Sequence, residues 1–240
     1  MDNTSYIALS RQIALQRQMN VVANNLANTT TTGYKGERML FETVLQQAGQ
    51  PRQVAYVQDL AVMRDTSDGP LVDTGNPLDL AIVGDGFLTV RTPDGDRYTR
   101  AGHFGLNPQG EIVNTSGHPL LDEGNGPIVV PSNDPTVTIS PDGTVSNRSG
   151  VLGRLRLAAF PNDAVLRIEG AGLYVSDTPP EGAATGRLLQ GSLENSNVQG
   201  ILEMTRMMEV VRAFEGTQRL IDTHHELARK AIERLGGGSA

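Results

Sequence analysis

The first amphipathic stretch of the chain has the spacing of a helix with one apolar face. Its apolar residues recur at steps of four, three and four positions: Leu15, Met19, Val22 and Leu26. This is the spacing of a coiled-coil seam. The pattern stops at Asn28 and the four threonines after it, because such side chains are poor in a helix interior. Gly33 then permits a flexible exit. We predict an N-terminal helix that packs on a partner helix.

A second helical pattern covers residues 197–235, near the other end of the chain. Its main apolar seam follows a seven-residue repeat: Met207, Val210, Phe214, Ile221, Ala228, Ala231 and Leu235. Thr217 and His224 are the only polar members of that seam. A helix over residues 201–235, at ~1.5 Å per residue, is roughly 50 Å long and well above the average length. We predict that this seam packs against the N-terminal helix.

The C-terminal helix carries a second apolar face, formed by Ile201, Met204, Met208 and Val211. An apolar stripe is normally buried in the core of its own domain. A surplus stripe at the end of a chain also suits contact with other subunits. Periodicity alone leaves these two interpretations equally open. On the second interpretation, the surplus face supplies the subunit-interface residues, and the paired seams supply the coiled-coil contact between the two terminal helices.

Between the two helices the pattern changes to short strands and frequent turns. Residues 78–83 and 87–90 flank the tight-turn signal Gly84-Asp85-Gly86, and Pro93-Asp94-Gly95 follows. Further short apolar or β-branched runs occupy residues 128–130, 137–139 and 155–160. Short strands with frequent turns favour an antiparallel β domain over alternating βαβ units.

The segment from residue 34 to residue 73 is ambiguous. Leu40, Phe41, Val44 and Leu45 are compatible with a short helix that Pro51 would end, and residues 50–73 read as a mostly extended connector. The predicted fold class is α+β, with discontinuous terminal coiled-coil helices that enclose a central antiparallel β domain. Residues 1–30 and 200–235 form the helical module, 31–77 and 190–199 the connector region, 78–189 the β domain, and 236–240 a flexible tail.

Composition narrows the classes of function. The 240 residues include no cysteine, which excludes disulfides, thiolate nucleophiles and sulfur-ligated metals. The formal net charge of −7 argues against a general nucleic-acid binder. This acidic excess lies in the middle of the chain, because residues 201–235 carry six acids and six bases. No apolar run approaches the ~18 residues of a membrane span, and the first residues lack the pattern of a cleaved secretory signal. We expect no direct membrane insertion.

The candidates for chemistry are weak. Arg229 stands where the zinc-protease pattern that begins at His225-Glu226 would need a second histidine, and His224 and His225 diverge by about 100° around a helix. A metal site built on Asp222, His225 and Glu226 is a minor alternative. Gly84-Asp85-Gly86 resembles the start of a dinucleotide fingerprint, but no helix pattern follows it. We predict no catalytic residue, no metal and no cofactor.

Three motifs carry a family resemblance. The first is Ala23-Asn24-Asn25-Leu26-Ala27-Asn28, with Thr31-Thr32-Gly33-Tyr34-Lys35 downstream. The second is Gly84-Asp85-Gly86-Phe87 with Tyr98-Thr99-Arg100-Ala101-Gly102-His103-Phe104. The third is Gly191-Ser192-Leu193-Glu194-Asn195-Ser196-Asn197-Val198, followed by Glu203-Met204-Thr205-Arg206-Met207-Met208 and Arg212-Ala213-Phe214. In this order, and over nearly the whole chain, these motifs resemble the bacterial flagellar rod and hook proteins.

The resemblance implies a non-enzymatic axial subunit that polymerises with copies of itself and with other flagellar rod subunits through its terminal helices. It also implies delivery by the flagellar export apparatus without a cleaved signal, and a place in the basal-body rod that crosses the periplasm. The short β region and the stretch 203–207 are more similar to proximal-rod subunits than to distal-rod or hook subunits, which are the alternatives within the family. Phe214 departs from the tyrosine that is common there.

Two other classes of function are less favoured. A ligand-binding β protein with a coiled-coil oligomerisation stalk would need exposed aromatic side chains, and the chain has five tyrosines, five phenylalanines and no tryptophan. An enzyme ranks third, because the sequence offers no catalytic constellation.

Overall fold

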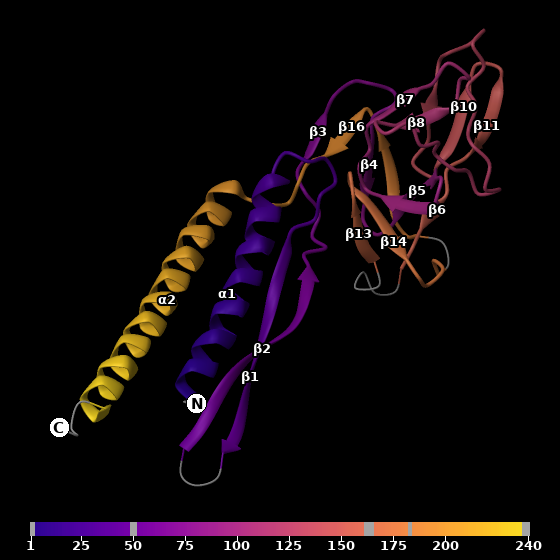
Figure 1. The fold of residues 1–240 in the computed structure, drawn as a ribbon. Helices are drawn as coiled ribbons and strands as arrows, with labels where there is room; N and C mark the ends of the chain where they lie inside the picture. Colours follow the sequence, from indigo (N-terminus) through magenta and orange to yellow (C-terminus); the bar gives the residue numbers. More distant parts are fainter. Residues whose placement is uncertain (1–2, 49–51, 161–165, 182–183, 237–240) are drawn as a thin grey trace. The chain divides into compact units, whose positions relative to one another are not determined.

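The computed structural model describes residues 3–48, 52–160, 166–181 and 184–236 (Figure 1). Over these residues the chain divides into two compact units. The helical unit comprises the described parts of Met1–Ala27, Glu37–Met63 and Gln199–Ala240. The β unit comprises those of Asn28–Gly36 and Arg64–Val198.

Two long helices form the body of the helical unit. Helix α1 spans Asn3–Ala27 and helix α2 spans Gly200–Gly236, and the two pack side by side (Figure 1). They run antiparallel, because Asn25 of α1 bonds Glu203 whereas Gln12 bonds Gln218. Both predicted terminal helices are therefore present, and their coiled-coil geometry stays a prediction. Neither helix, over its described residues, combines the length and apolarity of a membrane span.

A strand hairpin completes the helical unit. Strands β1 (Glu37–Ala48) and β2 (Arg52–Arg64) form a two-stranded sheet, and β1 packs against α1. The short helix expected around Leu40 to Leu45 is therefore wrong. Phe41, Thr43 and Val44 are residue types that favour strands, and pairing with β2 satisfies the backbone groups that a short isolated helix would leave open. The expected helix end at residues 49–51 lies outside the described residues.

The β unit is built from short strands. They are β3 (Leu71–Asp73), β4 (Leu80–Val83), β5 (Phe87–Thr92), β6 (Gly95–Thr99), β7 (Phe104–Leu106), β8 (Ile112–Asn114), β9 (Thr138–Ile139), β10 (Thr144–Asn147), β11 (Gly150–Arg154), β12 (Leu157–Ala158), β13 (Leu166–Gly170), β14 (Leu173–Ser176), β15 (Arg187–Gln190) and β16 (Ser192–Glu194). A five-stranded sheet has the order β12-β5-β6-β14-β13 and a three-stranded sheet the order β11-β10-β9. The pairs β15–β4, β16–β3 and β7–β8 complete the unit.

The strand pairs of the β unit are antiparallel, which confirms the predicted central antiparallel region. The predicted turn at Pro93-Asp94-Gly95 joins β5 to β6, where Thr92 pairs with Gly95. The run at residues 128–130 does not form a strand. It takes part only in isolated bridges, of Val129 with Glu111 and of the preceding Pro127 with Leu121. Pro127 and Pro131 flank that run and lack the N–H groups that a longer ladder needs.

Two apolar clusters stabilise the β unit. The larger joins residues from several of the sheets, and its largest fully buried members include Leu80, Ile82, Leu88, Ile112, Leu120, Ile128, Leu155 and Leu188. The smaller is aromatic, with edge-to-face contacts of Phe87 with Tyr174 at 5.6 Å and of Tyr98 with Phe160 at 4.7 Å between ring centroids. The β unit therefore has a core of its own.

Candidate assembly site

The side chain of Asn25 ties three segments of the helical unit together. Its amide donates to the carbonyl of Glu37 at 2.8 Å and accepts from the N–H of Glu37 at 2.9 Å, so it holds the start of β1 from both sides. The same amide donates to Glu203 Oε2 of α2 at 3.3 Å. Asn25 is 3% exposed and Glu203 is 4% exposed. Arg206 pairs with the other oxygen of Glu203 and balances its charge.

Glu203 belongs to the seam of α2, although a charged residue is not expected there. It precedes Val210 and Thr217 at seven-residue steps, and all three are buried. Thr217 satisfies its hydroxyl by donating to the carbonyl of Ala213 at 2.9 Å. The sequence reasoning missed Glu203 because it counted apolar positions. The regular step from Val210 was the signal that could have found it.

The predicted seam residues differ in how deeply they are buried. Val22 and Val210 are buried, and six others are half-buried: Leu15, Met19, Leu26, Met207, Phe214 and Ile221. Gln12 donates to Gln218 Oε1 at 2.7 Å and adds a second polar contact between the helices. Ala8 and Ala14 are also buried on α1, and small residues of this kind were not among the predicted seam residues.

The surplus face of α2 is open. Ile201 is 83% exposed, and Met204 and Met208 are each more than half exposed, whereas Val211 is half-buried. Leu220 and Leu227 extend exposed apolar surface along the same helix. We call Ile201, Met204 and Met208 the α2 stripe.

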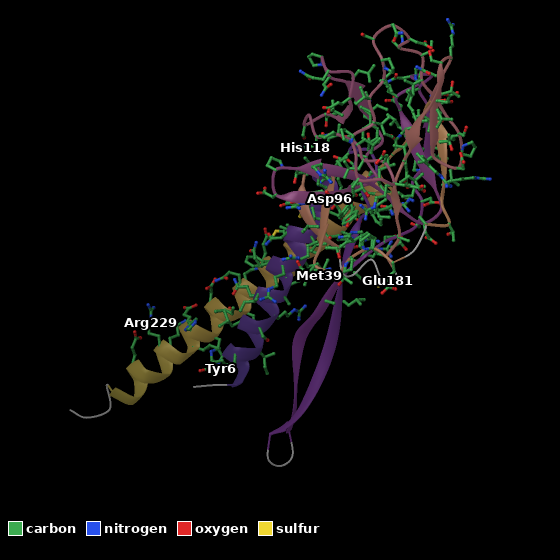
Figure 2. The ribbon with its side chains drawn as sticks, turned by 90° about the vertical axis from the view of Figure 1, so that its right-hand side faces the viewer. Tyr6, Met39, Asp96, His118, Glu181 and Arg229 are labelled. Atoms are coloured by element: carbon green, nitrogen blue, oxygen red, sulfur yellow. The ribbon has the colours of Figure 1, made fainter. Side chains whose placement is uncertain are left out.

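Helix α1 presents an apolar stripe that the sequence reasoning missed. Tyr6, Leu9 and Ile13 follow at steps of three and four residues, and each is about half exposed. Figure 2 labels Tyr6 near the start of α1 and Arg229 in the later part of α2. We call these three residues the α1 stripe. A row of exposed apolar side chains on one helix face is a candidate site of interaction with other proteins.

An ionic junction lies in the β unit, where the buried Lys35, Arg100 and Glu194 meet Asp68, whose side chain is 47% exposed. Lys35 Nζ is 2.6 Å from Glu194 Oε1, and Arg100 lies 3.3 Å from Glu194 Oε2. Asp68 is 3.5 Å from Lys35 and 3.3 Å from Arg100. Glu194 is 1% exposed and Lys35 is 2% exposed. Glu194 is therefore the buried partner of both cations, and Asp68 adds a second negative charge from the solvent-exposed edge of the junction.

Backbone contacts reinforce the ionic junction. Gly33 donates to the carbonyl of Glu194 at 2.7 Å, and Gly69 donates to Glu194 Oε1 at 2.9 Å. Asn197 accepts from Gly36 N–H at 2.8 Å and donates to the carbonyl of Asp65 at 2.9 Å. The stretch around Gly33-Tyr34-Lys35, the segment around Arg100, and the stretch 194–197 therefore meet in one place. The residues of the family motifs that lie here, Lys35, Arg100, Glu194 and Asn197, make contacts within the β unit.

The weak candidates for chemistry form no site among the described residues. No three histidine, aspartate or glutamate side chains come together there in a way that could hold a metal. Asp222 accepts a hydrogen bond from Gln218, and Glu226 pairs with Lys230 at 2.8 Å on the same face of α2. His103 is 2.8 Å from the buried carboxylate of Asp79.

The aromatic side chains of the β unit are not presented to a ligand. Tyr34, Phe87, Tyr98, Phe104 and Tyr174 are buried, and Phe160 packs against the aromatic cluster. A carbohydrate site normally stacks sugars on exposed rings, so the arrangement does not favour the ligand-binding alternative.

Family models match three parts of the chain. The model described as "Flagella basal body rod protein" matches residues 6–35, and "Flagellar hook protein FlgE/F/G D1 domain" matches residues 81–147. The model "Flagellar basal body rod FlgEFG protein C-terminal" matches residues 189–234. The matches therefore take in α1, much of the β unit, and α2 with the strands just before it.

Similar proteins align over nearly their whole length. The flagellar basal-body rod protein FlgF of Caulobacter vibrioides is 39% identical over 98% of this chain and 99% of its own. FlgF of Mesorhizobium japonicum is 34% identical over 100% of both chains. The rod protein FlgG of Agrobacterium fabrum is 34% identical over 95% of this chain and 98% of its own. The chain therefore belongs to the family of flagellar basal-body rod proteins, in which it is close to FlgF.

Proposed function

We propose that this chain is a structural subunit of the flagellar basal-body rod, in its proximal part, and that it acts by polymerising rather than by catalysis. Membership of the rod family supports the structural role. The match to two FlgF proteins over the whole chain supports the assignment to the proximal rod. Its partners are copies of itself and other rod subunits.

The observation that carries the mechanism is the pair of open apolar stripes on the terminal helices. Burying one Leu, Met or Ile side chain contributes ~1.5–3 kcal/mol. The α1 and α2 stripes hold six large residues between them, so contact with neighbouring subunits can offset the loss of freedom on association. The equal numbers of acids and bases in residues 201–235 also let copies approach without strong repulsion.

The β unit supplies a shell outside the helical contacts in this proposal. Its own apolar core and its ionic junction stabilise it through contacts within the unit. The acidic excess of the chain lies in this middle region, which favours a hydrated surface. We also propose that the flagellar export apparatus delivers the subunit without a cleaved signal. Membership of the rod family is what supports this part of the proposal.

Replacing Met204 by Asp tests the proposal. Met204 is more than half exposed, so the change leaves the packing of α1 on α2 intact and places a charge where a neighbouring subunit would desolvate it. In a strain that lacks the native gene, we expect Met204→Asp to abolish motility and to remove the subunit from purified basal bodies. His225→Ala, on an exposed part of α2, is the matched control and should leave both unchanged. Normal assembly of Met204→Asp, with motility lost in His225→Ala, would contradict the proposal and revive the metal hypothesis.

A further inference from the structure

Asn125 occupies an unusual position in the β unit. It is an exposed residue with a φ of 64°, in the left-handed region that non-glycine residues rarely adopt. It precedes Gly126, and this is the only Asn-Gly dipeptide in the sequence. An asparagine before glycine is chemically reactive, because no side chain hinders attack of the next backbone nitrogen on the asparagine amide carbon.

The turn around Asn125 brings the Asp122 carboxylate within hydrogen-bond distance of the Gly126 nitrogen, which is the atom that would attack. Gly126 N–H donates to Asp122 Oδ1 at 2.7 Å. The turn is closed by Asp122 N–H donating to the carbonyl of Gly126 at 2.9 Å and Asn125 N–H donating to that of Asp122 at 3.1 Å. A carboxylate at hydrogen-bond distance from a nucleophile's proton has the geometry of a general base.

The side-chain carbonyl of Asn125, whose carbon would be attacked, is hydrogen-bonded to a positively charged side chain. The Arg156 guanidinium donates to Asn125 Oδ1, and it is held by Asp96 at 3.7 Å (labelled in Figure 2). The backbone N–H of Arg156 also donates to the carbonyl of Leu121 at 3.1 Å. A fixed donor on a carbonyl oxygen stabilises the negative charge that develops when its carbon is attacked.

We propose that Asn125 is a site of self-catalysed deamidation in the folded chain, promoted by Asp122 and Arg156. The nitrogen of Gly126 attacks Cγ of Asn125 while Asp122 takes its proton, and Arg156 stabilises the oxyanion. The C–N bond of the side-chain amide breaks, and the leaving nitrogen takes up that proton and departs as ammonia. Water then opens the resulting succinimide, at Cγ to give aspartate or at the backbone carbonyl to give isoaspartate. One water is consumed and one ammonia released, with no oxidant or reductant.

The product changes both charge and backbone. A new carboxylate at position 125 joins Asp122 and Glu123 on the surface and faces Arg156. The isoaspartate form also lengthens the main chain by one carbon within the turn. The loop that carries it is anchored to strand β11 by Glu123 N–H donating to the carbonyl of Arg154 at 2.9 Å.

Mass spectrometry of the intact purified chain, incubated at neutral pH and then digested, tests the proposal. We expect position 125 to gain the mass of an amide-to-acid conversion, with isoaspartate, ahead of Asn195, which precedes a serine and is also exposed. Asp122→Asn and Arg156→Gln should each slow the conversion by about 10-fold or more.

Two glycine variants separate the chemistry from the fold. A Cβ at Gly126 would meet no atom closer than 3.6 Å, so Gly126→Ala keeps the turn and should reduce conversion to the level of Asn195. Gly105→Ala, with no atom within 4 Å of its Cβ position, leaves the dipeptide and Asp122 untouched and should still convert. Thermal unfolding checks that each variant is folded. Conversion of Asn125 no faster than that of Asn195, or conversion in folded Asp122→Asn and Arg156→Gln as fast as in the parent chain, would overturn the proposal.

Discussion

At Gly33 a single missing side chain allows two segments of the β unit to meet. The residue has a φ of 69°, and a Cβ there would lie 2.4 Å from the backbone carbon and oxygen of Arg100. We expect Gly33→Ala to lower the free energy of unfolding of the β unit by well over the ~1–2 kcal/mol that the left-handed conformation alone costs. Gly75→Ala is the matched control, because Gly75 has a φ of 68° and no atom within 4 Å of its Cβ position. Equal losses in the two variants, measured by chemical denaturation, would contradict the close approach.

Thr89 carries a hydroxyl that finds no hydrogen-bond partner among the described residues, although it is 0% exposed in β5. Valine has nearly the same shape and no polar atom. We therefore expect Thr89→Val to raise the free energy of unfolding by ~1 kcal/mol. Thr99→Val is the control, since Thr99 donates to the carbonyl of Gly172 at 2.8 Å and accepts from Ala101 N–H at 3.0 Å. Thr99→Val should lower the free energy of unfolding. A similar loss of stability in Thr89→Val would contradict the prediction, because it would show that the Thr89 hydroxyl has a hydrogen-bond partner.

At the scale of elements, the contact of Asn25 with Glu203 and Glu37 sets how α1, α2 and β1 pack. Asn25→Ala would leave a buried carboxylate and two backbone groups of Glu37 without this partner, so we expect a loss of roughly 2–4 kcal/mol in the stability of the helical unit. Gln12→Ala removes a more exposed contact between the same helices and should lose less than ~1 kcal/mol. Thermal unfolding followed by helical circular dichroism measures both. Similar small losses would show that apolar packing alone fixes the helix pair.

The elements differ in how far the sequence predicts them. The terminal helices and the turn at Pro93-Asp94-Gly95 follow from local spacing and turn chemistry, so they are visible in the residues themselves. The hairpin β1–β2 is not, because the apolar residues from Leu40 to Leu45 fit helical and strand periods equally well. Only pairing with β2, which is a tertiary event, decides between them.

The candidate site was predicted in part for a similar reason. The α2 stripe is readable from periodicity, and Ile201 and Met204 are indeed exposed. The ionic junction brings together Lys35, Arg100 and Glu194 from three distant segments. A sequence without known contacts does not say which lysine meets which glutamate. Family resemblance marked these positions, and the structure supplies their physical reason.

At the scale of the whole molecule, we propose that the two units have different tasks. The helical unit exposes the α1 and α2 stripes and is proposed to make the subunit contacts, whereas the β unit has an apolar core and an ionic junction of its own. The alignments with rod proteins extend over both units.

Cysteine accessibility in assembled rods tests the central claim most directly, because the chain has no cysteine of its own. A Met204→Cys variant is labelled with a maleimide in the free subunit and in purified basal bodies, and a Val151→Cys variant, on a 72% exposed residue of β11, controls for reagent access. We expect Met204→Cys to react in the free subunit and to be protected in basal bodies, because neighbouring subunits cover the α2 stripe, while Val151→Cys reacts in both. Equal labelling of Met204→Cys in the two states would contradict assembly through the terminal helices.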